Sequence, residues 1–597
     1  MSSIVGKSKL RLKIAGSRSS ALDIARGRLA LISVCFVLAY VIVLARIFDL
    51  SVIEGELAHF EYDRSSVQQD IAAPLLPRGN ILDRNGVLLA TSLKTASLFA
   101  DPSLVTDPAG LANDLVGIFP ELKYGDVLHS LQRDGRFVWV KRNITPQEQK
   151  AVLQVGSPAL NFRYDYSRIY PQGALVSHIV GTTNVDGKGV SGIEASFNGF
   201  LSQPTAKSKA RKVSGGKQDE PELYLTIDVR LQHALRREML RAKNEFSAKA
   251  GAGLIFDVVS GEILAAVSLP DFDPHNAGSY RNAENNPLFN RVTLGVYEMG
   301  STFKIFSTAA YLDTFNVSLA HKFDATKPIQ RGRFKISDYH AKDRILSIPE
   351  VFMYSSNIGS ALMGEELGTD RLRSFYSDLG LLNKASVEIS EIGGPLVPDP
   401  WRDINTITAS YGHGVAVSPL QLMVGASSIV NGGIRVEPTL IRSHEQSYKT
   451  PQKSHEVRVV SPQTAHRMRQ LLRLVVTDGT GENADVEGYS VGGKTGTAEK
   501  TGSGGYDRKK LLSSFIGFFP MEEPRYGVLI VMDEPKGTKA SFGYATGGWV
   551  STPAVGRVIR SMAAILGIPA NNVKKEEDIA ASLKVFISDE KKKGAGH

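Results

Sequence analysis

The stretch Gly300-Ser-Thr-Phe-Lys-Ile-Phe-Ser-Thr-Ala-Ala-Tyr-Leu312 joins a serine and a lysine three residues apart to an apolar helical pattern. Residues at this spacing lie on one helix face, so we expect Lys304 one turn beyond Ser301. Backbone amides at a helix start point toward incoming negative charge. A lysine desolvated beside a second cation can remove the proton of a serine hydroxyl. The stretch therefore predicts a catalytic serine, Ser301, with Lys304 as its general base.

A second polar motif follows the helix-like segment 348–354. It consists of Ser355, Ser356 and Asn357. Ser355 could hand a proton to a leaving amine, and Asn357 could hold a substrate amide. We therefore predict Ser355 and Asn357 as catalytic residues.

A third motif, Val491-Gly-Gly-Lys-Thr-Gly-Thr-Ala498, is expected to form a strand whose glycines let a substrate backbone lie close against it. Lys494 would be the second cation of the site. Thr495 and Thr497 would offer hydroxyls to a carboxylate, with Gly496 between them. This strand would thus supply one catalytic residue and the substrate-binding residues Thr495, Gly496 and Thr497.

Each motif also recurs elsewhere in the chain, which shows how weak each one is alone. The repeated spellings are Ser214/Lys217, Ser588/Lys591, Lys500-Thr-Gly502 and the Ser-x-Asn at Ser196. The first two lie in polar, charged segments that could not desolvate a lysine, and Lys500 is expected to open a Gly/Ser-rich loop. Only the set at 301, 355 and 494 has each motif on the element that its role needs.

The whole chain has 597 residues, 42% of them hydrophobic, which predicts several folded domains. We expect an α+β multidomain protein. Strands are predicted at 223–228, 252–257, 262–268, 512–519 and 526–532, and a helix at 229–243. Mostly helical stretches lie between the early and late strands. The domain at 221–567 should therefore be an antiparallel sheet flanked by helices, with an all-helical subdomain.

The N-terminus carries a topology signal. Basic residues dominate residues 1–28, and residues 29–45 contain no charge. We predict a basic cytoplasmic tail and a single membrane-spanning helix at 29–48, with everything after it facing outward. The alternative is a cleaved signal peptide. The net charge of +9 owes much to this tail, so it does not indicate nucleic-acid binding. The single cysteine, Cys35, lies in the apolar run and excludes an intrachain disulfide and a cysteine-based metal site.

Residues 55–220 mix short strand-like runs with turns and are expected to form a non-catalytic, β-rich domain. Asn85-Gly86 between two apolar runs predicts a hairpin with a type I′ turn. We expect Arg78, Asp83 and Arg84 to form a buried charge network at a domain junction. Residues 203–219 form a basic loop, and the charge-dense residues 573–597 are expected to be frayed or disordered.

The three motifs in this order resemble the signature of the penicillin-binding proteins. The intervals, 355 − 301 = 54 and 494 − 355 = 139 residues, are similar to those of that family. The RGNILDRNG block at 78–86 and the block 170–194 resemble the elongated pedestal, or dimerisation-type domain, of the class B members. The stretches 290–304 and 411–422 look most like the septal, FtsI-type branch.

The resemblance implies a peptidoglycan D,D-transpeptidase whose substrate is the D-alanyl-D-alanine end of a stem peptide. Ser301 would form an acyl-serine intermediate and release D-alanine, with the backbone amides of Ser301 and Thr497 as oxyanion hole. β-Lactams would be trapped at the same serine. The family further implies no cofactor, no metal and no nucleic acid. Its expected partners are a SEDS-type, FtsW-like glycan polymerase and other divisome membrane proteins, at the septum of the bacterial inner membrane.

Other functions remain open at this point. An elongation-type transpeptidase, a D,D-carboxypeptidase and a β-lactamase share the acylation machinery, although Glu365 and Glu366 are expected to be solvated rather than to activate a water. A β-lactam sensor is a further alternative. The segment Thr501–Lys510 is expected to be flexible and to gate the groove beside Lys494.

Overall fold

The computed structural model describes residues 34–41, 43–44, 77–203, 221–332, 334–442, 457–502, 505–570 and 578–588. The chain divides into two compact units, residues 1–75 and 76–597. In the first unit, the described residues 34–41 and 43–44 are helical. The described helices include none that is long and apolar enough to cross a membrane. Half of the segment predicted to span the membrane, 29–48, and the basic tail before it lie outside the described residues, as do residues 204–219 of the basic loop.

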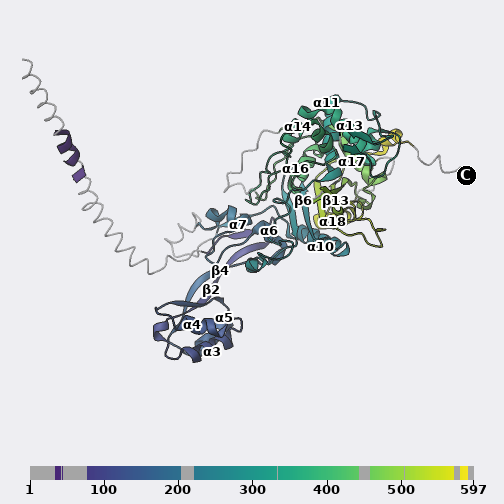
Figure 1. Cartoon of the computed structure of the whole chain (residues 1–597). Coiled ribbons are helices and arrows are strands. Elements are labelled where there is room, and N and C mark those ends of the chain that lie inside the picture. The colour runs from purple at the N-terminus through teal and green to yellow at the C-terminus, as the bar shows by residue number, and fades with distance from the viewer. Residues whose placement is uncertain are drawn as a thin grey trace, which may run out of the picture. The chain divides into compact units, whose positions relative to one another are not determined.

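The second unit begins with a five-stranded sheet in the order β3-β2-β1-β5, with β4 also paired to β2. Its strands are β1 (Asn80–Leu82), β2 (Leu88–Ala100), β3 (Val138–Ile144), β4 (Leu160–Ile169) and β5 (Glu222–Tyr224). Three helices lie together at one end of the long strands β2 and β4, namely α3 (Pro108–Ile118), α4 (Tyr124–Leu131) and α5 (Pro146–Val155) (Figure 1). Buried Leu98, Leu115 and Phe119 join them in one core. Shorter helices follow at η3 (Gly173–Val176), α6 (Ser177–Val180), α7 (Gly192–Ser196) and α8 (Asn198–Leu201).

The Asn85-Gly86 hairpin is confirmed, because β1 and β2 pair antiparallel on either side of it. Its turn is not type I′. Gly86 has a φ of 85°, whereas Asn85 does not have a positive φ, and the Gly86 amide donates to the Asp83 carbonyl. The connection is longer than two residues because Leu82 pairs with Leu88.

The predicted network of Arg78, Asp83 and Arg84 is wrong. Arg78 pairs with buried Glu194, while Arg84 reaches Glu262. The Asp83 carboxylate accepts backbone amides instead, among them that of Val229 at the start of the next domain. These charged residues have different partners because strand β1 separates Arg78 from Asp83 and Arg84.

The larger domain is built on an antiparallel five-stranded sheet in the order β12-β13-β14-β6-β7. Its strands are β6 (Ala250–Asp257), β7 (Ile263–Leu269), β12 (Gly492–Gly502), β13 (Gly505–Phe519) and β14 (Tyr526–Asp533). Side chains alternate between the two faces. Leu254 and Phe256 pack in the main core, whereas Ile255 packs with α10 (Val229–Glu245) and α18 (Ser551–Leu566). The mixed α+β fold and the antiparallel sheet are as predicted.

The other face of this sheet carries the segment between β7 and β12. Its helices are α11 (Lys304–Phe315), α12 (Ile348–Met353), α13 (Asn357–Leu367), α14 (Thr369–Asp378), α15 (Asp403–Ala409), α16 (Pro419–Val430) and α17 (Pro462–Asp478). The segment is not all-helical. Two strand pairs interrupt it, β8 (Lys322–Asp324) with β11 (Ile345–Ser347), and β9 (Ile329–Arg331) with β10 (Phe334–Ile336). Strands of three residues are too short to show an alternating pattern in the sequence.

Two further boundaries differ from the sequence prediction. The strand predicted at 223–228 ends at Tyr224, because Asp228 accepts the Arg230 amide and caps α10. Residues 501–502 and 505–510 belong to strands β12 and β13, in which Lys500 pairs with Asp507 and Thr501 with Tyr506. Lys500 is therefore in a strand and not in a loop, and its ammonium pairs with Asp533 and Glu534.

The C-terminal segment is the largest difference. Residues 578–588 were expected to be frayed, yet they dock on the larger domain through η7 (Ala581–Phe586) and buried Leu583. Asp578 pairs with Arg473 of α17 at 2.8 Å. The Ser347 hydroxyl donates to the Phe586 carbonyl at 2.8 Å, at the start of α12. In the sequence, the high density of charged residues masks the few apolar residues whose contacts order this segment.

Candidate active site

Ser301 lies in a tight 3₁₀ turn, η5 (Gly300–Phe303), that runs directly into α11. Three glycines allow the turn to pack where it does. Gly300 has a φ of 53°, which favours glycine, and a Cβ there would lie 2.7 Å from the Thr497 carbonyl oxygen. A Cβ on Gly412 would lie 1.9 Å from the Gly300 carbonyl oxygen. A Cβ on Gly496 would lie 2.7 Å from the Met299 carbonyl oxygen. The nucleophile turn, β12 and the segment at 412 therefore meet backbone to backbone.

Lys304 is fully buried and is held by the second motif. Its ammonium donates to the Ser355 carbonyl at 2.6 Å, to Asn357 Oδ1 at 2.7 Å and to Ser355 Oγ at 3.1 Å. In the part of the chain that the structure describes, the Ser301 hydroxyl has no hydrogen-bond partner. Catalytic hydrogen bonds are often long in a site without substrate.

Lys494 of β12 is the second buried cation. Its ammonium donates to Ser355 Oγ at 2.9 Å. Burial lowers the pKa of Lys494 to about 7. Burial, and secondly the charge of Lys494, hold the pKa of Lys304 well below its usual range, against the opposing attraction of Asp338. The lowered pKa of Lys304 favours its neutral amine, the form that a general base requires.

Ser355 connects the two lysines. Its hydroxyl oxygen accepts a hydrogen bond from each ammonium group, so its own proton is available for donation. The residue has a φ of 59°, unusual for a side chain other than glycine or asparagine. It lies between α12 and α13, and Ser356 caps α13 by accepting the Gly359 amide. The structure therefore brings Lys304, Ser355, Asn357 and Lys494 together as the sequence predicted.

Each of the three residues predicted to bind substrate has neighbours within the protein. The Thr495 hydroxyl lies 2.7 Å from that of Thr480 and is buried, so it is bonded within the protein. A Cβ on Gly496 would meet the Met299 carbonyl oxygen and the Ser514 hydroxyl. Thr497 is half-buried, and its hydroxyl accepts the Gly547 amide at 3.0 Å, so its proton is free to bind a ligand. Thr495 and Thr497 lie two residues apart on β12 and share one face, but Thr495 is buried whereas Thr497 is half-buried.

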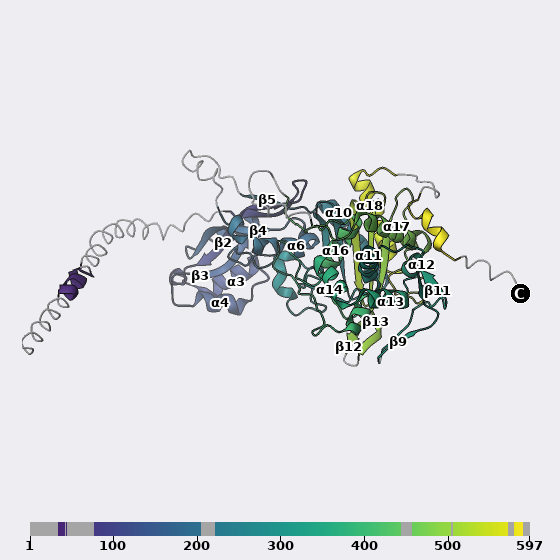
Figure 2. The ribbon, with the colours of Figure 1, turned by 90° about the horizontal axis from the view of Figure 1, so that it is seen from above.

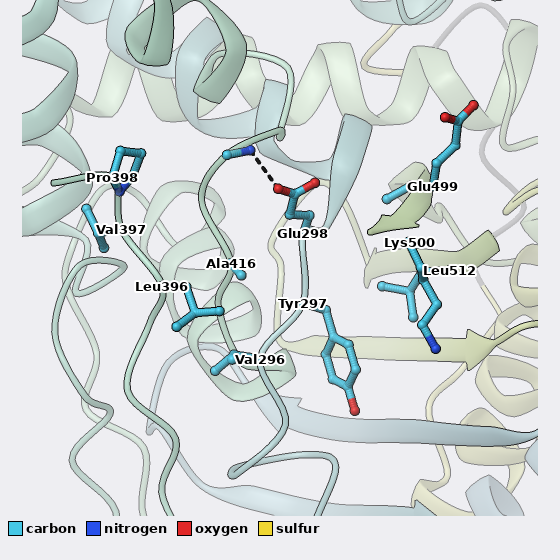
Figure 3. Close-up of a pocket in the computed structure, with 12 residues that line it drawn as sticks. Val296, Tyr297, Glu298, Leu396, Val397, Pro398, Ala416, Glu499, Lys500 and Leu512 are labelled. Carbon is cyan, nitrogen blue, oxygen red and sulfur yellow. Dashed lines mark hydrogen bonds between the residues drawn. The ribbon is translucent and has the colours of Figure 1, made fainter. Parts of the chain in front are cut away.

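A pocket of about 390 Å³ lies beside β12, beyond Thr497 (Figure 3). Its lining combines apolar side chains, such as Val296, Leu396 and Leu512, with the charged Glu298, Glu499 and Lys500. Glu298 accepts the Gly414 amide at 2.9 Å, drawn as the dashed line in Figure 3, and the Tyr506 hydroxyl at 3.0 Å. Burial raises the pKa of Glu298, against these two hydrogen bonds. Of these residues, Tyr506 belongs to the segment predicted as a gate.

The other described occurrences of the three motifs lie elsewhere in the structure. Ser196 is in α7, and Asn198 binds Arg78. The Ser588 amide donates to Glu350, while Lys591 and the pair at 214 and 217 lie outside the described residues. Glu365 is exposed and pairs with Arg331, and exposed Glu366 accepts the Tyr311 hydroxyl. The described residues include no group of three His, Cys, Asp or Glu side chains placed to hold a metal ion.

Comparison with known families identifies two domains in the chain. Residues 251–560 match the penicillin-binding protein transpeptidase domain, and residues 75–219 match the penicillin-binding protein dimerisation domain. The chain therefore belongs to the penicillin-binding proteins, in their class B, FtsI-type branch. It is 39% identical over 497 residues to a probable peptidoglycan D,D-transpeptidase FtsI of Caulobacter vibrioides, covering 82% of each chain.

Other relatives are similar over most of their length. The peptidoglycan D,D-transpeptidase FtsI of Escherichia coli is 29% identical, with 89% of this chain and 90% of that protein covered. The stage V sporulation protein D of Bacillus subtilis is 30% identical, with 92% and 88% covered. Penicillin-binding protein 3 of Mycobacterium tuberculosis, crystallised with aztreonam, has the same fold with a TM-score of 0.64 at 23% identity, covering 83% of this chain and 97% of that one.

Proposed function

We propose that this protein is a peptidoglycan D,D-transpeptidase that cross-links stem peptides during septal wall synthesis and is acylated by β-lactams. The observation that carries the proposal is the position of the Ser355 hydroxyl, which accepts hydrogen bonds from the two buried lysines, Lys304 and Lys494. The FtsI names of its relatives support the septal role.

In the proposed reaction, Ser301 Oγ attacks the carbonyl carbon of the penultimate D-alanine while its proton passes to the neutral Lys304 amine. The backbone amides of Ser301 and Thr497 stabilise the oxyanion. The C–N bond to the terminal D-alanine then breaks, and the leaving amine takes a proton through Ser355. An amine of a second stem peptide attacks the acyl-serine, forms the new amide and returns a proton to the serine oxygen.

The placement of β12 supports this proposal. It is the outermost strand of its sheet, so an extended peptide can add to its free edge. Thr497 would bind the terminal carboxylate, and Lys494 would add positive charge beside it. The pocket beyond Thr497 gives room for the remainder of the stem peptide.

The decisive experiment is covalent labelling with a fluorescent penicillin. Wild-type protein should be labelled, and Ser301→Ala should not. Labelling that survives this substitution would overturn the assignment of the nucleophile. A purified stem-peptide donor with an amine acceptor should then separate cross-linking from hydrolysis, because a carboxypeptidase would release D-alanine without forming the new amide.

The same proposal includes a single-pass anchor at 29–48 in the inner membrane, with the catalytic domain at 221–567 in the periplasm and the pedestal at 55–220 between them. The uncharged run 29–45 after a basic tail supports it. A SEDS-type polymerase and other divisome proteins are the proposed membrane partners. Protease added outside spheroplasts should digest the catalytic domain and spare a tag placed before residue 29. A protected catalytic domain would contradict this topology.

A further inference from the structure

The connection between β10 and β11, residues 337–344, contacts the start of α13. Asp338 accepts two hydrogen bonds there, from the Ser356 hydroxyl at 2.7 Å and from the Ile358 amide at 2.9 Å. The neighbouring Ser337 carbonyl accepts from Asn357 Nδ2 at 3.1 Å. One short segment thus binds each of the three residues that follow Ser355. Figure 2 shows β11 beside α12, and β10 contacts α13; these two helices flank the motif.

Ser355 needs support from both sides. Its left-handed backbone conformation is strained for a residue other than glycine. On the side of α12, the Ser356 amide donates to the Val351 carbonyl at 2.9 Å. On the side of α13, Asp338 accepts a hydrogen bond from the Ser356 hydroxyl. The oxygen of Ser356 in turn accepts the Gly359 amide at 3.0 Å. Asp338 therefore anchors the half of the motif that α12 does not.

Asp338 also brings a negative charge to a site that holds two cations. The charged or titratable groups that face Lys304 are Lys494 from β12, His413 from the segment before α16, and Asp338. Burial, and secondly the charge of Lys304, lower the pKa of His413 to about 4, so it is neutral at neutral pH. Of these groups, only Asp338 attracts the protonated form of Lys304.

We propose that Asp338 is a positioning residue of the acylation step, whose carboxylate holds Ser355 and Asn357 in the arrangement that the Lys304 amine binds. The inference rests on the proposed function, since it concerns acylation of Ser301. Asp338 acts through the second motif and the start of α13, to which both of its hydrogen bonds go.

The test measures the second-order rate constant for acylation of the full-length chain by a fluorescent penicillin, from pH 5 to pH 9. Asp338→Asn keeps the shape of the side chain but loses the charge and one acceptor. We expect its rate to fall about tenfold or more, because charge-assisted hydrogen bonds are the stronger ones. Its acid limb should move to lower pH, because Lys304 loses its proton more readily without the carboxylate. Asp343→Asn is the matched control, since it removes the same charge from an exposed position of the same connection, and it should behave as wild type.

Asp338→Glu separates the effect of the charge from that of the hydrogen bonds. It also replaces the asparagine variant as the test if that variant does not fold. It keeps the charge but misplaces the hydrogen bonds, so its rate should fall while its acid limb stays in place. A wild-type rate for either folded variant would overturn the inference, as would a slower Asp338→Asn enzyme with an unmoved acid limb. Ser301→Ala distinguishes the two proposals. If it is still labelled, the proposed function fails; if it is not labelled and Asp338→Asn acylates normally, only the role of Asp338 fails.

Discussion

Replacing Gly412 by alanine should disable the site through a backbone contact far from the three motifs in sequence. The added Cβ would lie 1.9 Å from the Gly300 carbonyl oxygen, whereas ordinary contact begins at 3.4 Å. One of the two backbones must therefore move by about 3.4 − 1.9 = 1.5 Å. Because Gly300 precedes Ser301, the nucleophile would move too, and a misplacement of ~1 Å can cost ~10²-fold in rate. We expect acylation by a fluorescent penicillin to fall about 100-fold.

The control for this prediction is Gly432→Ala. Both glycines have a strongly positive φ, 90° at Gly412 and 100° at Gly432, so both substitutions carry a strain of roughly 1–3 kcal/mol. A Cβ on Gly432 meets nothing within 4 Å. The control should therefore lose stability in a thermal melt but acylate normally once folded. Equal acylation rates for the two variants would refute the claim that the Gly300 contact places the nucleophile.

Three further substitutions test other parts of the structure. Lys304→Ala should abolish penicillin acylation and leave a folded protein by circular dichroism; acylation near the wild-type rate would refute its role as base. Lys494 has a pKa of about 7 in the folded protein, against roughly 10.4 when unfolded, so between these values the unfolded chain binds more protons and stability rises with pH. The melting temperature should accordingly rise less from pH 7 to pH 9 in Lys494→Met than in wild type, and an equal rise would contradict the depressed pKa. Leu583→Ala should lower the free energy of unfolding by about 2 kcal/mol, measured in urea, because it empties a buried site of the C-terminal segment. An unchanged midpoint would show that this segment does not contribute to the core.

Much of the fold could be predicted because its elements are long and strongly patterned. The strands β6, β7, β13 and β14 and the helix α10 all carry clear apolar periodicity. Prediction failed where elements are short or where charge masks a few apolar contacts. The three-residue strands β8 to β11 and the docked segment 578–588 are of this kind. The strand residues 501–502 and 505–510 were missed because glycine and serine are typical of loops, although the ladder to Asp507 orders them.

The sequence by itself determined which groups can do the chemistry. A serine hydroxyl, two lysine amines and an asparagine amide are properties of residue type, and short spacing on one element places Ser301 beside Lys304. Tertiary structure alone decided the rest. Lys494 lies 139 residues from Ser355, and only the sheet and the helices packed on it bring their side chains within 2.9 Å. Packing also turned Thr495 toward Thr480 and brought Asp338 to α13. The physical reason is that burial and hydrogen-bond partners depend on distances through space, which spacing along the chain does not specify.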